Sequence, residues 1–379
     1  MKLNLNLGFS ERRRKKEKQI DKVSSLNPDR IVLQRLLRNP VAIVSSAVIV
    51  FFILVAILGY WLSPDKTPFA NEQHLEIAVK KPGFKVDMLQ ISDREAVKQN
   101  IFKTMLFGKV SSTTNIPIYS HRNTEKGLEY EIFTGDNPNG GEIKYLDKNT
   151  EYRIKTRTYP LGTDRYGRCL LSQLIIGTRV SVSVGFIAII IAIVIGITLG
   201  ALAGYFQGKI DAVIMWFINV VWSVPTILLV IAITFALGKG FWQIFVAVGL
   251  TMWVDIARMV RGQVLSLKEK EFVLAGKVLG FSNARIIIKH ILPNVVNALT
   301  VIITSNFATA ILQEAGLSFL GLGVQPPMPS WGSMIKENYG YIILDAAYMA
   351  IIPGLAIMIL VLSFFMLGNA IRQATEIKQ

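Results

Sequence analysis

Glycine–lysine pairs and histidines are the residues of this sequence that could do chemistry, and their neighbours decide whether they can. A nucleotide-binding loop reads G-x-x-x-x-G-K-[ST], because its final hydroxyl holds the magnesium ion. Gly108-Lys109, Gly208-Lys209 and Gly276-Lys277 are each followed by an apolar residue. His74 and His121 are isolated, and the sequence has no H-E-x-x-H, G-x-S-x-G or paired-carboxylate signature. We therefore expect no catalytic residue, no metal and no cofactor on this chain, and no ATP hydrolysis by it alone.

A charged stretch at 268–294 has a different pattern, which indicates binding rather than catalysis. Apolar runs long enough to cross a membrane lie on both sides of it. Its charged side chains would be costly inside a bilayer. Along a helix it also carries an apolar stripe. The stripe contains Leu267, Leu274, Ala275 and Val278, and Phe272 and Leu279 widen it. Exposed apolar surface of this kind predicts cover, either by helices of the same chain or by a protein partner.

The local signals in this stretch predict two helices joined by a turn. We expect the first helix over residues 265–279, ended by Gly280 in a left-handed conformation. Ser282 or Asn283 then caps a short second helix. Pro293 opens the following apolar run. The expected result is a helix–turn–helix that projects from the membrane face.

The composition is that of a polytopic membrane protein. Of 379 residues, 51% are hydrophobic and 18% are charged, whereas soluble domains carry about 25% charged residues. The net charge of +15 does not indicate nucleic-acid binding, because the basic residues gather in the N-terminal tail and at 268–289. The positive-inside rule places both segments in the cytoplasm. The single cysteine, Cys169, excludes an internal disulfide.

Apolar blocks predict six membrane spans with both termini in the cytoplasm. The blocks cover 41–62, 180–205, 210–237, 241–260, 293–313 and 346–368. About 20 apolar residues suffice to cross the bilayer, and the first block is expected to be a retained anchor. Pro225 interrupts the third block, which is either a short helix plus a span or one kinked span. Gly196, Gly200 and Gly204 have a spacing that allows close helix contact.

The regions between the spans follow from this topology. Residues 1–40 are a basic cytoplasmic tail that ends in an amphipathic helix or an ordinary juxtamembrane segment. Residues 63–176 are extracytoplasmic, residues 177–372 form the core with five spans, and 373–379 are a cytoplasmic tail. Alternation and a Gly-rich turn at 127–159 predict a hairpin or small β unit, and residues 93–107 are compatible with a helix. The predicted fold is therefore an all-α polytopic membrane protein with an external α+β insertion between helices 1 and 2.

The run EFVLAGKVLGFSNARIIIKHILPN resembles the cytoplasmic EAA loop of ABC-importer permeases. That loop reads E-A-A, then Gly, then a Leu-Pro pair at fixed spacing. Ala275, Gly280, Leu292 and Pro293 match, whereas Leu274 replaces the Glu and Gly276 the second Ala. In the family this loop is the coupling helix, which sits in a groove on the ATPase subunit. The resemblance thus implies a coupling loop at 261–292. Its docking residues are Phe272, Leu274, Ala275, Gly276, Val278, Gly280, Leu292 and Pro293.

Other stretches resemble the C-type permease subunit of dipeptide/oligopeptide importers. LGTDRYGRCLLSQLIIGTRVSVSVG at 161–185 is similar to the external G-T-D-x-x-G-R-D stretch of that subunit, with Cys169 in place of the last Asp. The external-motif residues are Gly162, Thr163, Asp164, Gly167 and Arg168. EAGLSFLGLGVQPPMPSWGSMI at 314–335 resembles the loop before the last span. Residues 84–158 have no family counterpart and are interpreted as an insertion.

The resemblance implies a permease subunit in a bacterial inner membrane that forms half of a pathway for di- or oligopeptides. It implies a second permease subunit as heterodimer partner, two cytoplasmic ATPase subunits that carry ATP and Mg, and an extracytoplasmic peptide-binding protein. The remaining partner is the lipid bilayer, and nucleic acid is not expected. One alternative is the same family carrying another small solute such as nickel. The other is a membrane-anchored receptor or enzyme that acts through residues 63–176.

Several polar residues have two interpretations. Asp164, Arg165 and Arg168 either touch substrate or the binding protein, or form a structural knot. In the knot, Thr163 or Asp164 would cap an interfacial helix. Glu314 either bonds the backbone of the 316–323 loop, which we favour, or has a role in translocation. Other polar residues either line the pathway or bond between helices. These are Asn219, Ser223, Asn306 and Thr309.

Overall fold

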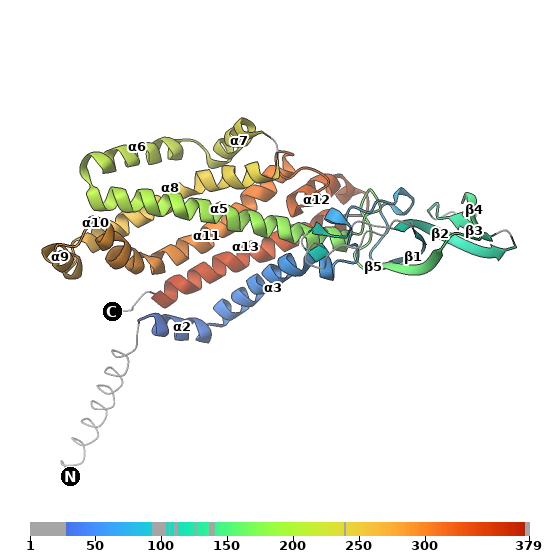
Figure 1. Cartoon of the computed structure of the whole chain (residues 1–379), viewed down its shortest axis with the longest axis horizontal. Helices are drawn as coiled ribbons and strands as arrows, with labels where there is room; N and C mark the ends of the chain where they lie inside the picture. Colours follow the sequence, from blue (N-terminus) through green and yellow to red (C-terminus); the bar gives the residue numbers. More distant parts are fainter. Residues whose placement is uncertain are drawn as a thin grey trace, which may run out of the picture.

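The computed structural model describes residues 28–92, 104–105, 107–109, 113–125, 127–135, 141–238 and 240–375. A bundle of long helices carries a small sheet at one end (Figure 1). Within the described residues, five helices are long and apolar enough to cross a membrane, or up to six if one bent pair counts as a span. The predicted fold class, a polytopic helical membrane protein with a sheet-containing insertion, is confirmed.

The N-terminal arm consists of α2 (Pro28–Arg38) and α3 (Pro40–Leu62). Between them, the Asn39 side chain accepts a hydrogen bond from the Val41 amide at 2.9 Å and caps α3. A proline follows at the first position of α3, where the helix has no use for an amide proton. Arg35 donates to the Ala374 carbonyl at 3.1 Å, so this arm is tied to the end of the last helix.

The centre of the bundle is the pair α5 (Leu170–Phe206) and α8 (Phe241–Lys268). Three glycines of α5 lie against α8, as their spacing predicts. A Cβ on Gly200 would lie 2.5 Å from the Ala257 carbonyl oxygen. Both helices are longer than the predicted spans, because hydropathy marks only the part in lipid and the helix continues into polar flanks.

The third predicted span is split into α6 (Gly208–Ser223) and α7 (Thr226–Leu237), which are bent by 97°. Pro225 lies at the break. Proline cannot donate a helical hydrogen bond and disfavours helical backbone in the residue before it. The predicted interruption is confirmed, and the bend is too sharp for one kinked helix. Figure 1 shows α6 running beside α8, and α7 lying at a sharp angle to α6.

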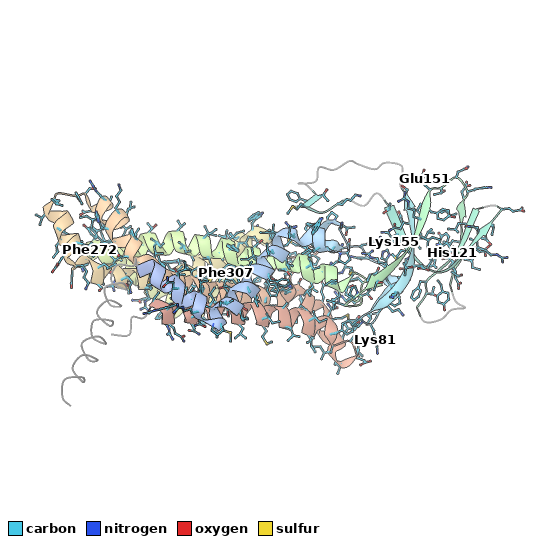
Figure 2. The ribbon with its side chains drawn as sticks, turned by 90° about the horizontal axis from the view of Figure 1, so that it is seen from below. Lys81, His121, Glu151, Lys155, Phe272 and Phe307 are labelled. Carbon is cyan, nitrogen blue, oxygen red and sulfur yellow. The ribbon has the colours of Figure 1, made fainter. Side chains whose placement is uncertain are left out.

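The C-terminal half is helical almost throughout. After α8 come α9 (Glu271–Val278), α10 (Asn283–Arg285), the π-helical η3 (Ile286–Ile291), α11 (Leu292–Phe319), α12 (Trp331–Asn338), the 3₁₀ helix η4 (Tyr339–Ile343) and α13 (Tyr348–Thr375). Phe307 of α11 stacks on Phe364 of α13 with ring centroids 4.2 Å apart. Figure 2 shows Phe307 in the middle of the bundle, where these rings join two helices.

The insertion forms a five-stranded sheet in which all neighbours are antiparallel. Its strands are β1 (Phe84–Ser92), β2 (Thr113–Thr124), β3 (Gly127–Ile132), β4 (Ile143–Asp147) and β5 (Tyr152–Tyr159), in the order β4-β3-β2-β1-β5. Two short 3₁₀ turns, η1 (Pro68–Ala70) and η2 (Leu75–Ile77), precede it. Leu89 pairs with Ile116 on one side and Ile154 on the other. The predicted β unit is confirmed, and β1 and β2 extend it. The helix considered at 93–107 lies largely outside the described residues.

The two ends of the bundle differ. Figure 1 places α2, α9 and the C-terminal end of α13 at one end and the sheet at the other. Any site at α9 is therefore separated from any site near the sheet by the length of the spans.

Candidate functional site

The charged stretch at the α9 end contains two helices where one was expected. α8 ends at Lys268, and α9 begins at Glu271, with Lys270 in an extended conformation. The prediction of one helix over 265–279 is wrong. Lysines and glutamates at the break are well solvated, so ending the helix there costs little free energy. The change of direction lets Val273 turn inward, and it is fully buried.

The outer face of α9 is apolar and exposed. Phe272 and Leu274 are 43% and 47% exposed, and Val278 and Leu279 are 88% and 70% exposed. Ala275 is exposed beside them, while Gly276 is buried on the opposite face. Figure 2 shows Phe272 at the tip of this end of the molecule. The predicted docking residues therefore divide, with Gly276 facing the chain itself and most of the others facing outward.

A dense set of contacts holds α9 in place. Gly280 has a φ of +75°, as predicted, and the Phe281 amide bonds the Gly276 carbonyl at 3.0 Å. Ser282 accepts from the Arg285 amide at 3.4 Å, which confirms Ser282 as a cap. Phe281 stacks on His290 at 5.6 Å. These contacts join α9 through η3 to α11. Leu292 is half-buried at the start of α11, and Pro293 is exposed there.

At the opposite end, Arg168 connects three segments. Its Nε donates to Asp164 Oδ2 at 2.6 Å, its Nη2 to Glu337 Oε2 at 2.6 Å, and its Nη1 to Asn71 Oδ1 at 3.3 Å. Burial disfavours the guanidinium charge, but the two carboxylates outweigh it and raise the pKa of Arg168. A buried cation with two anionic partners is a fixed structural joint.

The other residues of the external motif complete this joint. Thr163 Oγ1 donates to the Ile77 carbonyl at 2.6 Å and accepts from the Lys80 amide at 2.8 Å. Gly167 has a φ of +71°, and a Cβ there would lie 1.7 Å from the His74 carbonyl oxygen. Gly162 likewise has positive φ. The motif is thus a knot that fastens the 71–80 segment to the start of α5.

One detail of the predicted knot is wrong, because neither Thr163 nor Asp164 caps α5. Cys169 occupies the cap position and makes no side-chain cap bond. Asp164 is folded back on its own loop, where it accepts from the Tyr166 and Arg168 amides, each at 2.9 Å.

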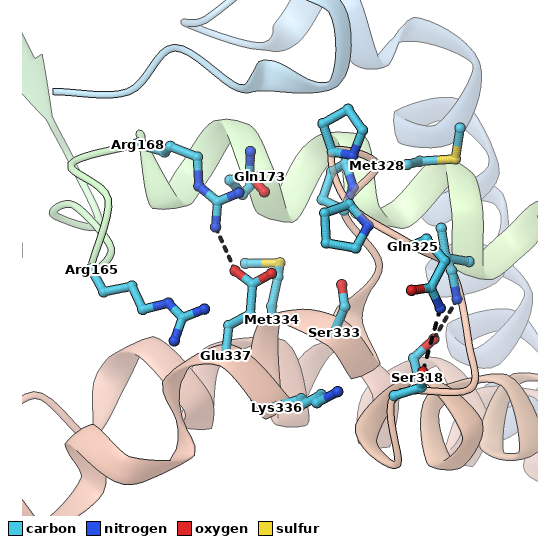
Figure 3. Close-up of a pocket in the computed structure, with 15 residues that line it drawn as sticks. Arg165, Arg168, Gln173, Ser318, Gln325, Met328, Ser333, Met334, Lys336 and Glu337 are labelled. Carbon is cyan, nitrogen blue, oxygen red and sulfur yellow. Dashed lines mark hydrogen bonds and ion pairs between the residues drawn. The ribbon is translucent and has the colours of Figure 1, made fainter. Parts of the chain in front are cut away.

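A pocket of about 180 Å³ opens beside this joint. Figure 3 shows Arg165, Lys336 and the Arg168–Glu337 pair around it, with the proline-rich 325–329 loop on the far side. Arg165 lies over the Tyr166 ring at 4.5 Å. Its Nε has no partner among the described residues. This pocket is lined by three cationic side chains, those of Arg165, Arg168 and Lys336, and by the Glu337 carboxylate, which lowers its net positive charge.

A second joint fastens the sheet to the helices. Glu72 accepts from Arg157 of β5 at 2.5 Å and also from Asn115 of β2, and His74 Nε2 lies 3.2 Å from the same carboxylate. Burial disfavours the Glu72 charge, yet His74 and Arg157 together lower its pKa to about 2. Sequence reasoning missed Glu72, Asn71 and Glu337, because their partners are distant in the sequence.

Polar residues in the spans have mostly local partners. Glu314 is fully buried and accepts from Ser181 at 3.1 Å and from Ser318 at 2.7 Å. Its partners are hydroxyl groups, so the expected bonds to the 316–323 backbone are not found within the described chain. Thr309 donates to Ser305, and Asn306 is buried. Asn219 and Ser223 are exposed on α6.

Comparison with known proteins identifies the family. Residues 196–377 match the model of "Binding-protein-dependent transport system inner membrane component", and residues 28–82 match that of "N-terminal TM domain of oligopeptide transport permease C". The chain is 39% identical over 236 residues to the dipeptide transport system permease protein DppC of Alkalihalophilus pseudofirmus, which is 62% of this chain and 77% of that protein. This chain belongs to the ABC-importer permease family. The permease is therefore a multi-pass protein of the bacterial inner membrane.

Two further comparisons are a curated relative and a solved structure. The permease is 39% identical over 234 residues to the glutathione transport system permease protein GsiD of Pectobacterium atrosepticum, covering 62% of this chain and 77% of that one. A solved structure of the MetNI methionine ABC transporter, in an inward facing conformation, is 21% identical with a TM-score of 0.45, covering 55% of this chain and 98% of that chain. The sheet at 84–159 lies between the two regions that the family models match.

Proposed function

We propose that the permease forms half of the transmembrane pathway of an ATP-driven importer of di- or oligopeptides. The relatives named for dipeptide and glutathione transport support a peptide-like substrate. The structural observation that carries the coupling role is α9, which exposes apolar side chains on a helix anchored to the spans.

The proposed partner of α9 is a groove on a cytoplasmic ATPase subunit. Each large apolar side chain that leaves water contributes about 1.5–3 kcal/mol. Docking of α9 would therefore be favoured by burial of Phe272, Leu274 and Val278. ATP and Mg would bind to the pair of ATPase subunits, and their closure would move α9 as a rigid body.

The path from α9 into the membrane follows the packed contacts. Phe281 stacks on His290, and η3 continues directly into α11. Tyr205 at the end of α5 donates to Asn283 at 2.8 Å. A displacement of α9 therefore acts on α5 and α11 together, which is what a coupling helix requires.

The remaining partners are assigned by position. α6 exposes Trp216, Phe217 and Trp222, and we assign this face to the second permease subunit and lipid. The extracytoplasmic binding protein is assigned to the end that carries the sheet and the pocket in Figure 3.

The test replaces Ala275→Glu on the exposed face of α9. A charge there is expected to abolish co-purification of the ATPase subunits and uptake of a labelled dipeptide, while membrane insertion stays intact. The control is Gln373→Glu, which puts the same charge on an exposed residue at the end of α13. Normal assembly and uptake by Ala275→Glu would refute the docking assignment. Uptake of nickel in place of dipeptide by the unaltered importer would refute the substrate class.

A further inference from the structure

Asp255 is a charged residue inside one of the membrane-spanning helices. It lies in α8, which runs from Phe241 to Lys268 and qualifies as a span. Its side chain is exposed in this chain, and it has no ion pair among the described residues. A carboxylate within a span is costly unless it faces a partner or a water-filled cavity. Asp255 does not stabilise the fold through an ion pair with any described residue, so we look for a functional role for its carboxylate.

The residue lines a cavity of about 80 Å³ between α6, α7, α8 and α11, at the 97° bend. One water requires roughly 10–15 Å³ of such space, so the cavity admits a small polar group but not a whole peptide. Its polar lining consists of Thr226, Thr251, Asp255, Thr309 and Gln313.

These lining groups present acceptors to the cavity. Thr251 donates its hydroxyl proton to the Val248 carbonyl at 2.8 Å, and Thr309 donates to Ser305 at 3.1 Å. Both hydroxyl oxygens are thus left to accept. Gln313 Oε1 is buried with no partner in the described part of the chain. Together with the carboxylate of Asp255, this is a site for a group that carries several donors.

The cation closest in sequence does not neutralise the carboxylate. Arg258 lies three residues further along α8, and its guanidinium lies over the Trp222 ring at 3.7 Å. Such stacking holds the guanidinium by cation–π attraction. No ion pair between Arg258 and Asp255 is present in the described structure.

We propose that the Asp255 cavity is a binding site for a primary ammonium group in the translocation pathway. A primary ammonium has three donors and no acceptor, which complements this lining. Given the proposed function, on which this assignment of the ligand rests, the group is the protonated N-terminal amine of the transported peptide. The apolar part of the lining consists of Val221, Trp222, Leu229, Met252 and Val254.

The first experiment measures charge selectivity without any peptide. Cys169→Ser removes the single, buried thiol, and Thr309→Cys places a new thiol in the cavity of the complete importer in nanodiscs. Two methanethiosulfonate reagents are compared, one with an ammonium group and one with a sulfonate. Relative to their rates with a free thiol, the ammonium reagent should react about tenfold faster, because opposite charges a few ångströms apart attract.

Variants at Asp255 test whether its carboxylate causes this charge preference. Asp255→Asn should abolish the preference, and Asp255→Glu should retain it. Asp345→Asn makes the same change at an exposed external residue and should leave the preference unchanged. Equal normalised rates for the two reagents with Asp255 present would overturn the inference. So would the absence of any reaction, which would mean that a side chain of the second subunit fills the cavity.

The second experiment identifies the ligand. A dipeptide with a free amine, at saturating concentration on both sides of the membrane, should slow the labelling several-fold, and its N-acetylated form should not. Equal protection by both forms, or by neither, in an importer that takes up the dipeptide would overturn the ammonium assignment. If the charge preference holds and the unaltered importer takes up no peptide, the proposed substrate fails while the ammonium site stands.

Discussion

Glu72 and Arg157 form an ion pair at 2.5 Å that joins the linker after the first span to the last strand of the sheet. The residues are 85 positions apart in the sequence. Both side chains are largely buried, and the Glu72 carboxylate also contacts Asn115 and His74. This pair therefore fixes the sheet to the helical part of the permease.

The attachment of the sheet should depend on pH. The folded pKa of Glu72 is about 2, below its ordinary 4.5, so its stabilisation is complete above about pH 4.5 and is lost as the pH falls toward 2. The difference corresponds to roughly 3 kcal/mol. Hydrogen exchange at β1 and β5, corrected for intrinsic rates, should show weaker protection at pH 3 than at pH 7. In Glu72→Gln this pH difference should largely disappear, and an unchanged pH dependence would contradict the role of Glu72.

Arg168 should be among the most sensitive residues of the external end. Arg168→Gln leaves the Asp164 and Glu337 carboxylates without their cation, and loss of a buried partner costs about 3–5 kcal/mol. A lower thermal unfolding temperature in detergent would measure it. The control is Lys81→Met, whose pair with Asp345 is exposed and should matter little. Equal effects of the two variants would show that the Arg168 joint adds no particular stability.

The contact between α5 and α8 should reject even one methyl group at Gly200. A Cβ there would lie 2.5 Å from the Ala257 carbonyl oxygen and 2.9 Å from the Val260 Cβ. We expect Gly200→Ala to lower the free energy of unfolding by about 1–3 kcal/mol.

Gly262 on α8 is the matched control, since nothing lies within 4 Å of a Cβ built there. Gly262→Ala should be neutral or stabilising by up to about 1 kcal/mol, because alanine favours the helix. Thermal unfolding of both variants in the same detergent tests the pair. A neutral Gly200→Ala would mean that the helices can separate without cost.

The transfer of movement from α9 to the spans should depend on Phe281. Its ring stacks on His290, and the Arg285 guanidinium lies over it at 4.0 Å. Phe281→Ala is expected to leave the ATPase subunits bound but to lower dipeptide uptake roughly three- to tenfold, because the link between α9 and α11 loosens. ATP hydrolysis should continue, so the ratio of peptide imported to ATP hydrolysed is the measurement. Phe107→Ala, at an exposed external residue, is the control, and an unchanged ratio in Phe281→Ala would place the path elsewhere.

The sheet should be dispensable for membrane insertion and for assembly with the ATPase subunits. The Gly83 amide bonds the Tyr159 carbonyl at 2.9 Å, so deleting residues 84–158 leaves two ends that can be joined directly. Glu72→Gln should accompany the deletion, because Arg157 is lost with it. We expect membrane insertion and assembly with the ATPase subunits to persist. Loss of binding-protein association would assign the sheet a docking role, whereas loss of membrane insertion would contradict its separateness.

Local signals in the sequence predicted local structure well. Pro225 marked the break between α6 and α7, Gly280 the end of α9, and Gly200 the close approach to α8, since each acts on its own backbone. The apolar blocks predicted the spans because a helix that crosses lipid requires a continuous run of apolar residues. The apolar face of α9 was visible for a different reason, because its residues follow helical spacing within a charged stretch.

Features that depend on distant partners were not predictable in this way. Nothing near Glu337 or Asn71 in the sequence indicates that both contact Arg168. The end of α8 at Lys268 was missed because the helical pattern continues past it, and only the packing of Val273 shows why the chain turns. Asp255 was not singled out from the sequence, because the cavity that it lines requires four helices to be in place.

The hydrogen bond between Gly83 and Tyr159 brings together the two ends of the segment that forms the sheet. Where the two ends of an extra segment lie one hydrogen bond apart, a gene can gain or lose that segment without redirecting the helices on either side. An insertion attached in this way leaves the course of the neighbouring helices unaffected, so the sheet and the spans are structurally separable.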